Sequence, residues 1–247
     1  MNSILITGAN RGIGLGLVKA FINSERNPNI IVAACRKPNE ATDLQKLAEN
    51  HKNINILQLE VNKFETFKDF AKNVSNIVQN NGLNLLVNNA GISHKFLRIG
   101  SLQAEPMMEE FAINCVAPLM LSKELLPLLK QAAENNKDLP ICSQRAAIVN
   151  ISSILGSISD NDQGGFYPYR CSKSALNAAT KSLSIDLKPY NILAMCLHPG
   201  WIKTSMGGPK APLEVDTACA TIVHTISNLA CGHNGGFFTF EGRELKW

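Results

Sequence analysis

Short runs of apolar residues recur along the chain, and longer segments of mixed polarity separate them. The runs are rich in Ile, Val and Leu and occupy residues 3–7, 30–34, 54–59, 84–88, 147–152, 192–197 and 236–240. Continuous apolar runs that end in turn residues are typical of strands buried on both faces, as in a parallel sheet. The pattern therefore predicts a parallel sheet of about seven strands.

The segments between these runs predict helices. They cover residues 13–24, 40–51, 65–80, 105–130, 168–188 and 213–229. Because strand and helix alternate along the chain, we expect an α/β fold, a doubly wound (Rossmann-type) sheet with helices on both faces. The hydrophilic stretch 131–145 is interpreted as a surface excursion, and no Pro- or Gly-rich linker divides the chain. A single domain over residues 1–247 is therefore expected.

Composition excludes several other classes of protein. The chain is 45% hydrophobic and 18% charged, and its formal net charge of +4 contains no long run of one sign. Disorder is excluded by this balance, and the clustered basic residues of a nucleic-acid-binding surface are missing. We therefore expect a globular protein without a nucleic-acid partner.

The cysteines and the targeting patterns indicate the compartment. The seven cysteines are odd in number, include no C-x-x-C pair and have no His at metal-ligand spacing. Reduced thiols and no metal site are expected. No signal-peptide pattern occurs, and no apolar run approaches the roughly 18 residues of a membrane span. These observations predict a cytoplasmic protein without a membrane partner.

A glycine-rich turn, Thr7-Gly8-Ala9-Asn10-Arg11-Gly12-Ile13-Gly14, directly follows the first predicted strand. Gly8 can turn the chain out of the strand, and Gly12 and Gly14 remove Cβ atoms where a diphosphate would approach a helix start. The spacing G-x-x-x-G-x-G differs from both G-x-G-x-x-G and the phosphate loop of nucleotide triphosphatases. Its position between strand and helix favours a dinucleotide site over a plain turn.

The end of the second strand indicates which dinucleotide binds. An acidic residue there would bind a ribose 2′-hydroxyl, whereas Arg accommodates a 2′-phosphate. This strand is followed by Arg36 and Lys37, and Arg11 lies in the glycine turn. A charge-assisted hydrogen bond contributes roughly 1.5–3 kcal/mol, or about tenfold to hundredfold in preference. NADP(H) is therefore the predicted cofactor, and a solvated basic turn is the alternative.

Tyr169 and Lys173 are candidates for proton transfer. They are four residues apart near the start of the predicted helix 168–188 and therefore share one face. A nearby ammonium lowers the pKa of a tyrosine, so the pair can give or take a proton at a carbonyl or alcohol oxygen. Ser153 ends the preceding strand and offers a hydroxyl to the same oxygen. The turns Asn88–Gly91 and Pro199-Gly200 end two further strands at the same edge.

Together these motifs resemble the short-chain dehydrogenase/reductase family. The resemblance is carried in order along the chain by Thr7, Gly8, Gly12, Ile13, Gly14, Asn88, Asn89, Ala90, Gly91, Asn114, Ser153, Tyr169, Lys173, Pro199 and Gly200. Several longer segments are similar to the sniffer-type carbonyl reductases within that family. The resemblance implies NADPH-dependent reduction of aldehydes, ketones or quinones to alcohols.

The resemblance also implies a role for each site residue. Tyr169 would donate the proton, Ser153 would hold the oxygen, Lys173 would bind the nicotinamide ribose, and Asn114 would anchor a water in the proton relay. The cofactor would be bound by Gly8, Arg11, Gly12, Ile13, Gly14, Arg36, Glu60, Val61, Asn89, Ala90, Gly91, Tyr169, Lys173, Pro199, Gly200 and Thr204. Glu60 departs from the Asp usual in the family, which leaves the adenine contacts open.

Substrate and partners follow from the same resemblance. The loops 93–104, 157–166 and 201–212 are expected to frame an apolar carbonyl substrate, with a wall of Trp201, Phe166, Tyr167 and Met206. A homodimer or homotetramer is expected, because the insertion that keeps some carbonyl reductases monomeric is missing. An NADP-linked alcohol or steroid dehydrogenase and a dinucleotide-sensing regulatory protein remain as alternatives. The complete catalytic set argues against the sensor.

Overall fold

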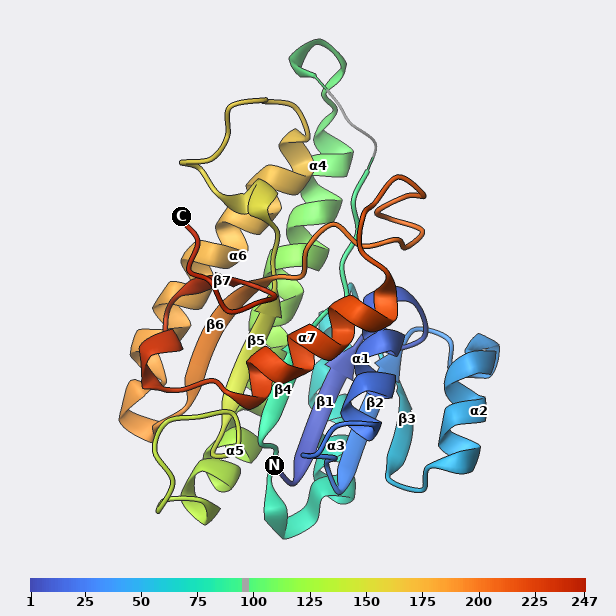
Figure 1. Ribbon diagram of the computed structural model, residues 1–247, viewed down its shortest axis with the longest axis vertical. Coiled ribbons are helices and arrows are strands. Elements are labelled where there is room, and N and C mark those ends of the chain that lie inside the picture. Colours follow the sequence, from blue (N-terminus) through green and yellow to red (C-terminus); the bar gives the residue numbers. More distant parts are fainter. Residues whose placement is uncertain (95–97) are drawn as a thin grey trace.

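A parallel sheet of seven strands lies at the centre of the computed structural model, which describes residues 1–94 and 98–247. In those residues the strand order is β3-β2-β1-β4-β5-β6-β7, and every neighbouring pair is parallel. The strands are β1 Ser3–Thr7, β2 Ile30–Cys35, β3 Ile54–Gln58, β4 Leu85–Asn88, β5 Ala147–Ile151, β6 Leu193–His198 and β7 Phe237–Thr239. The predicted α/β fold is confirmed (Figure 1).

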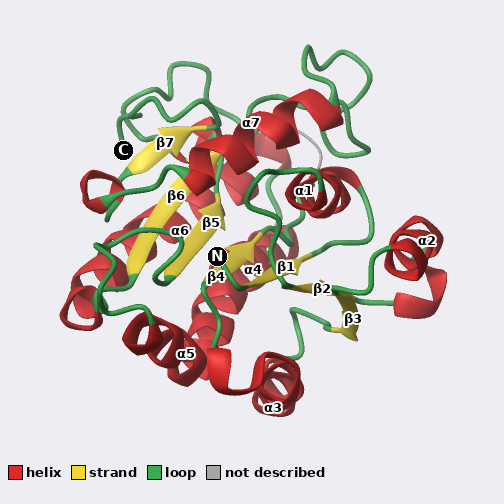
Figure 2. Cartoon of the chain, turned by 60° about the horizontal axis from the view of Figure 1, so that its bottom comes forward, coloured by secondary structure: helices red, strands yellow, loops and turns green. Residues whose placement is uncertain are grey.

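Helices cover both faces of the sheet (Figure 2). They are α1 Gly12–Ile22, α2 Thr42–Asn50, α3 Phe67–Val78, α4 Ala104–Phe111, α5 Ala117–Asn135, α6 Tyr167–Asp186 and α7 Val215–Ser227. One buried cluster joins the sheet to α1, α2 and α7, and the other joins it to α3, α5 and the end of α6. The strands are apolar at successive positions because both of their faces are covered.

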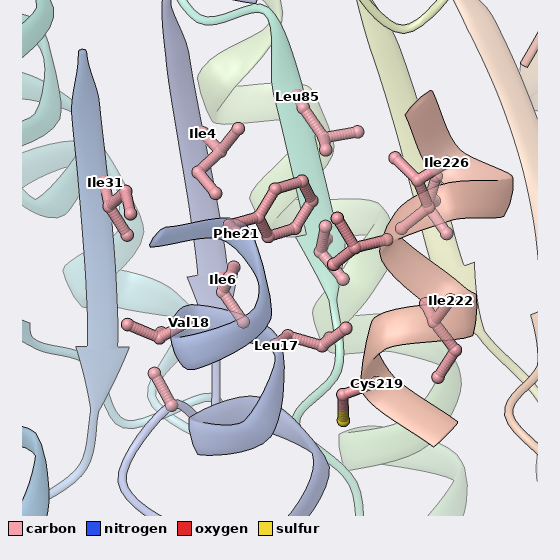
Figure 3. Close-up of a cluster of buried hydrophobic side chains, with 14 of the residues drawn as sticks. Ile4, Ile6, Leu17, Val18, Phe21, Ile31, Leu85, Cys219, Ile222 and Ile226 are labelled. Atoms are coloured by element: carbon pink, nitrogen blue, oxygen red, sulfur yellow. The ribbon is translucent and has the colours of Figure 1, made fainter. Parts of the chain in front are cut away.

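Strand β1 shows how the alternation of side chains builds both clusters. Ile4 and Ile6 lie in the cluster beneath α1 and α7, whereas Leu5 between them lies in the cluster on the opposite face. Figure 3 shows Phe21 of α1 and Ile222 of α7 in the first cluster, beside these strand residues. Each of these side chains is 0% exposed. Burying one such side chain contributes roughly 1.5–3 kcal/mol, so β1 holds the two layers together.

The winding of the chain reverses at β1. The chain moves from β1 outward to β2 and β3, then returns to place β4 on the other side of β1. In a sheet of this kind the loops after these two strands separate and leave a crevice at their carboxyl ends. The loops after β4, β5 and β6 extend from the same end of the molecule (Figure 1).

The helical region before β5 differs from its prediction. The single helix expected at 105–130 begins at Ala104, contains a π-helical turn at Ala112–Val116, and continues as α5 to Asn135. The start of the stretch 131–145 is therefore helix and not the predicted surface excursion. Ala132 and Ala133 explain the difference, because they are 0% and 2% exposed and extend the buried face of the helix.

The same region bears on the expectation that no segment spans a membrane. The continuous helix Ala104–Asn135 is long and apolar enough for a span by length and composition, with a mean hydropathy of 1.4 in its most apolar window. Half of that window is buried inside the fold, where α5 packs against α3 and α4 packs against α6. Core helices of globular proteins have the same properties, so this helix is weak evidence for a membrane span.

Candidate active site

The glycine turn between β1 and α1 forms a concave strip of backbone. Gly8 and Gly12 have φ angles of 66° and 53°, which residues with a side chain rarely adopt. A Cβ on Gly14 would lie 2.1 Å from the carbonyl oxygen of Gly8 and 2.7 Å from Asn89 Nδ2. Helix α1 begins here without a side-chain cap or an acidic residue in its first turn. Its N–H groups and the positive end of its dipole therefore face the turn, as anion binding requires. Ile13 packs against the buried cluster between the sheet and α1.

Two exposed arginines flank the glycine turn, one in the turn itself and one after β2. Arg11 Nη1 donates a hydrogen bond of 3.4 Å to Ser205 Oγ. Lys37 forms an ion pair of 2.7 Å with Glu40, whereas Arg36 forms no ion pair within the described residues. The guanidinium of Arg36 is therefore the available one in the basic turn.

Hydrogen bonds connect the end of β4 to the glycine turn. Thr7 Oγ1 accepts hydrogen bonds of 3.0 Å from the backbone N–H groups of both Asn89 and Ala90. The side chain of Asn89 donates to the carbonyl oxygen of Thr7 at 2.8 Å. The predicted cofactor residues Asn89, Ala90 and Gly91 therefore line the turn, and the amide of Asn89 holds it in place.

A network of buried, hydrogen-bonded polar side chains lies below the site and was not predicted from the sequence. Asn88 Nδ2 donates to Ser122 Oγ at 3.3 Å and to Asn150 Oδ1 at 2.8 Å, and Asn150 Nδ2 donates to Thr180 Oγ1 at 2.8 Å. This hydrogen-bond network connects β4 and β5 to α5 and α6. The signal was visible, since Asn88 and Asn150 are amides inside otherwise apolar strands.

Ser153, Tyr169 and Lys173 lie close together in the structure. The hydroxyl of Ser153 acts on the phenol of Tyr169 and lowers its pKa. Lys173 Nζ lies 5.6 Å from the centre of the Tyr169 ring and donates to the carbonyl oxygen of Ile151 at 2.7 Å. Ser153 and Lys173 are buried. Helix α6 thus presents the Tyr and Lys to the carboxyl end of β5, where Ser153 follows.

The predicted lowering of the Tyr169 pKa is wrong for this structure. Burial raises the pKa of Tyr169 to about 12, and the negative charge of Glu110 acts in the same direction against the hydrogen bond from Ser153. Burial also lowers the pKa of Lys173 to about 8, although Cys196, Glu110 and Cys115 oppose this change. Desolvation is the largest cause of the shift for both groups. At neutral pH Tyr169 therefore keeps its proton.

Asn114 lies in the π-helical turn between α4 and α5 and is fully buried. Its Nδ2 donates to the carbonyl oxygen of Ile92 at 2.8 Å and to Ser172 Oγ at 3.0 Å, and its Oδ1 accepts from the N–H of Ile92 at 2.9 Å. Isolated π turns are frequent at functional sites. The side chain of Asn114 links the loop after β4 to α6, between Tyr169 and Lys173.

The loop after β6 covers the glycine turn. Gly200, next to Pro199, turns the chain with a φ of 88°. The Thr204 methyl group lies 3.4 Å from where a Cβ on Gly12 would stand. Trp201 Nε1 donates to the carbonyl oxygen of Gly207 at 2.8 Å, and Trp201 is 55% exposed. Thr204 is therefore beside the cofactor strip, and Trp201 presents apolar surface.

Three further predictions concern Glu60, Val61 and the substrate loop 93–104. Glu60 forms an ion pair of 2.6 Å with Lys63, and Val61 is half-buried against the cluster below α3. Residues 95–97 of the predicted substrate loop 93–104 lie outside the described residues. In the described part of the chain, no group of three or more His, Cys, Asp or Glu side chains is arranged to hold a metal ion.

The fold and this edge of the sheet define a class of protein. The chain belongs to the short-chain dehydrogenase family, whose model matches residues 2–214. The resemblance to sniffer-type carbonyl reductases is also confirmed. The carbonyl reductase Sniffer of D. melanogaster is 50% identical, with 100% of both chains covered and a TM-score of 0.99.

Two further relatives widen the comparison. The NADPH-bound carbonyl reductase from chicken fatty liver is 40% identical, with 100% of this chain and 99% of that chain covered and a TM-score of 0.94. The C-signal of Myxococcus xanthus is 36% identical over 165 residues, which are 67% of this chain and 93% of the relative.

Proposed function

We propose that this protein is an NADPH-dependent carbonyl reductase that converts aldehydes, ketones or quinones to alcohols. The observation that carries the proposal is the convergence of Tyr169, Ser153 and Lys173 at the carboxyl end of β5, with Lys173 Nζ 5.6 Å from the centre of the Tyr169 ring. A group with a pKa of about 12 is a proton donor at neutral pH, which is the role that carbonyl reduction requires.

The strip around the glycine turn fits NADP(H). Gly14 allows the start of α1 to pack directly against the carbonyl oxygen of Gly8, the N-terminus of α1 suits the diphosphate, and Arg11 and Arg36 suit the 2′-phosphate. Thr204 lies beside Gly12 and would contact the cofactor there, whereas Gly91, beside Lys173, would border the nicotinamide together with Pro199-Gly200. When bound, NADPH supplies a hydride for the carbonyl carbon.

The chain's own residues supply the proton. Tyr169 donates its phenolic proton to the carbonyl oxygen, and the hydroxyl of Ser153 orients that oxygen. Lys173 has a pKa of about 8, so it is mostly an ammonium at neutral pH. One N–H of this ammonium is used by Ile151, which leaves two to hold the nicotinamide ribose and to restore the proton of Tyr169.

The alternatives require different properties of the same site. NADP-linked oxidation of an alcohol or steroid would use the same residues in the reverse direction, with Tyr169 as the base. A dinucleotide-sensing regulatory protein needs the cofactor strip but not the convergence of Ser153, Tyr169 and Lys173. Because the chain is 50% and 40% identical to two carbonyl reductases, reduction is the function that is best supported.

Assembly and location form part of the proposal. The outward face of α6 carries the small residues Ser174, Ala175, Ala178 and Ala179, which are half-buried or exposed. Met108 and Phe111 of α4 are 69% and 44% exposed. Such surfaces suit a helix-to-helix homodimer or homotetramer. The cysteines of the described residues are free thiols, as expected for a cytoplasmic protein.

Purified protein is expected to oxidise NADPH when aromatic aldehydes, aliphatic ketones and quinones are supplied, and to use NADH at least tenfold less efficiently. The fall in NADPH absorbance and the alcohol product measure this turnover. Absence of NADPH consumption over the whole panel, with NADPH still bound, would instead support the regulatory protein. Faster oxidation of alcohols by NADP⁺ at neutral pH would support the dehydrogenase.

Gly14→Ala is expected to raise the Kd for NADPH at least tenfold, or roughly 1.4 kcal/mol. The new Cβ would meet the Gly8 carbonyl oxygen at 2.1 Å, so the turn must move. Fluorescence titration with NADPH measures the change. Gly232→Ala is the control, because its Cβ would meet no atom within 4 Å. Equal Kd values for the two variants would contradict the placement of the diphosphate.

A further inference from the structure

Glu110 is a buried acidic residue that none of the motifs includes. It lies in the last turn of α4 and is 0% exposed. Its Oε1 accepts a hydrogen bond of 2.6 Å from the backbone N–H of His94 and contacts His94 Nδ1 at 2.8 Å. Its Oε2 is also buried and has no hydrogen-bond partner within residues 1–94 and 98–247. Burying a carboxylate costs free energy unless other groups pair with its charge or donate hydrogen bonds to it.

Glu110 and Asn114 hold the same loop. Asn114 contacts both the N–H and the carbonyl oxygen of Ile92, and Glu110 contacts His94 two residues later. This loop directly follows Gly91, where a Cβ would lie 3.0 Å from Asn114 Oδ1 and 3.7 Å from Lys173 Nζ. The two side chains therefore fix a segment of backbone that borders the catalytic lysine.

The charge of Glu110 also acts on the catalytic pair. It raises the pKa of Tyr169 and the pKa of Lys173, in each case as a smaller cause than burial. Neutralising this one carboxylate would therefore lower the pKa of both groups. The other titratable or charged groups that contact His94, act on Lys173 or lie buried beside the pair on α6 are Glu109, Cys115, Cys196 and Arg170.

Glu109 and Arg170 do not act on the pKa values of Tyr169 and Lys173 as Glu110 does. Glu109 points its carboxylate to the other nitrogen of His94, at 3.2 Å, and is 57% exposed, so solvent screens its charge. Arg170 is buried on α6 and donates to the carbonyl oxygen of Leu155 at 3.4 Å. Among the described acidic residues, only Glu110 contributes to the pKa values of both Tyr169 and Lys173.

We propose that Glu110 is a positioning residue for the reduction: one oxygen fixes the loop after β4, and its buried carboxylate sets the charge environment of Tyr169 and Lys173. The inference rests on the proposed function. It assigns two separable contributions to one side chain, a geometric one through His94 and an electrostatic one through Tyr169 and Lys173.

Two substitutions separate these contributions. Glu110→Gln keeps the shape and removes the charge, so the alkaline limb of kcat/KM against pH should move to lower pH by roughly one pH unit. Glu110→Asp keeps the charge and shortens the reach to His94, so the pH profile should stay and KM for the carbonyl should rise about threefold to tenfold. Glu109→Gln, the same charge change on the adjacent residue, is the control and should leave the profile unchanged.

A measurement without turnover distinguishes failure of this inference from failure of the proposed function. The chain has 3 tyrosines, so NMR of protein labelled at the tyrosine Cζ, with Tyr169→Phe for assignment, follows deprotonation of Tyr169 directly. Deprotonation at lower pH in folded Glu110→Gln than in wild type is expected. The same titration in both proteins would overturn the electrostatic contribution, even if no carbonyl were reduced. An unchanged KM in Glu110→Asp would overturn the geometric one.

Discussion

Tyr169→Phe is expected to lower kcat for an aromatic aldehyde or a quinone by about 10²–10⁴-fold, the usual contribution of a positioned proton donor. The substitution removes the hydroxyl on which Ser153 acts and leaves the ring beside Lys173. NADPH affinity is expected to stay within about twofold, because the diphosphate and the 2′-phosphate would be held by the glycine turn and the arginines and not by Tyr169. Steady-state kinetics and fluorescence titration measure the two quantities separately.

Tyr190→Phe provides the matched control for Tyr169→Phe. Tyr190 is 44% exposed, and Lys130 Nζ lies 3.6 Å from the centre of its ring, away from the site. The control removes the same hydroxyl group from the protein surface and should leave kcat unchanged. Turnover by Tyr169→Phe at the wild-type rate would show that another group donates the proton.

Arg36→Asp is expected to reduce the preference for NADPH over NADH by at least tenfold. One charge-assisted hydrogen bond to the 2′-phosphate contributes roughly 1.5–3 kcal/mol, which corresponds to about tenfold to hundredfold. The introduced carboxylate also repels a 2′-phosphate and can accept a hydrogen bond from a 2′-hydroxyl. The ratio of kcat/KM for the two cofactors is the quantity to compare.

Lys37→Gln is the control for this substitution. Lys37 carries the same charge in the same turn, but its ion pair with Glu40 is exposed and occupies the ammonium. Its loss should leave the cofactor preference unchanged. If Arg36→Asp also left the ratio unchanged, the 2′-phosphate would have to lie elsewhere, with Arg11 as the remaining candidate.

Much of the fold was predictable because the sheet is buried on both faces. The continuous apolar stretch of β1 predicted a parallel strand, and the loops that follow such strands predicted the position of the site. The end of α5 was not predictable in the same way. Polar residues dominate after Lys130, and only packing shows that Ala132 and Ala133 extend a buried helical face.

The proximity of the candidate catalytic residues was predictable from the sequence, and their electrostatics were not. The spacing of Tyr169 and Lys173 is local, so it predicts that they share a helical face. The pKa of Tyr169 depends on burial and on Glu110, which approaches from a different helix. Glu109 and Glu110 are indistinguishable in sequence, and only the fold buries one and exposes the other.

The central claim is that this site transfers a hydride from NADPH to a carbonyl carbon while Tyr169 supplies the proton. NADPH deuterated at its transferable nicotinamide position tests this claim directly, with mass spectrometry of the product formed by the wild-type protein. We predict an alcohol that carries deuterium on the former carbonyl carbon, and almost no product from Tyr169→Phe. An unlabelled alcohol, or deuterium transfer that is undiminished in Tyr169→Phe, would contradict this account.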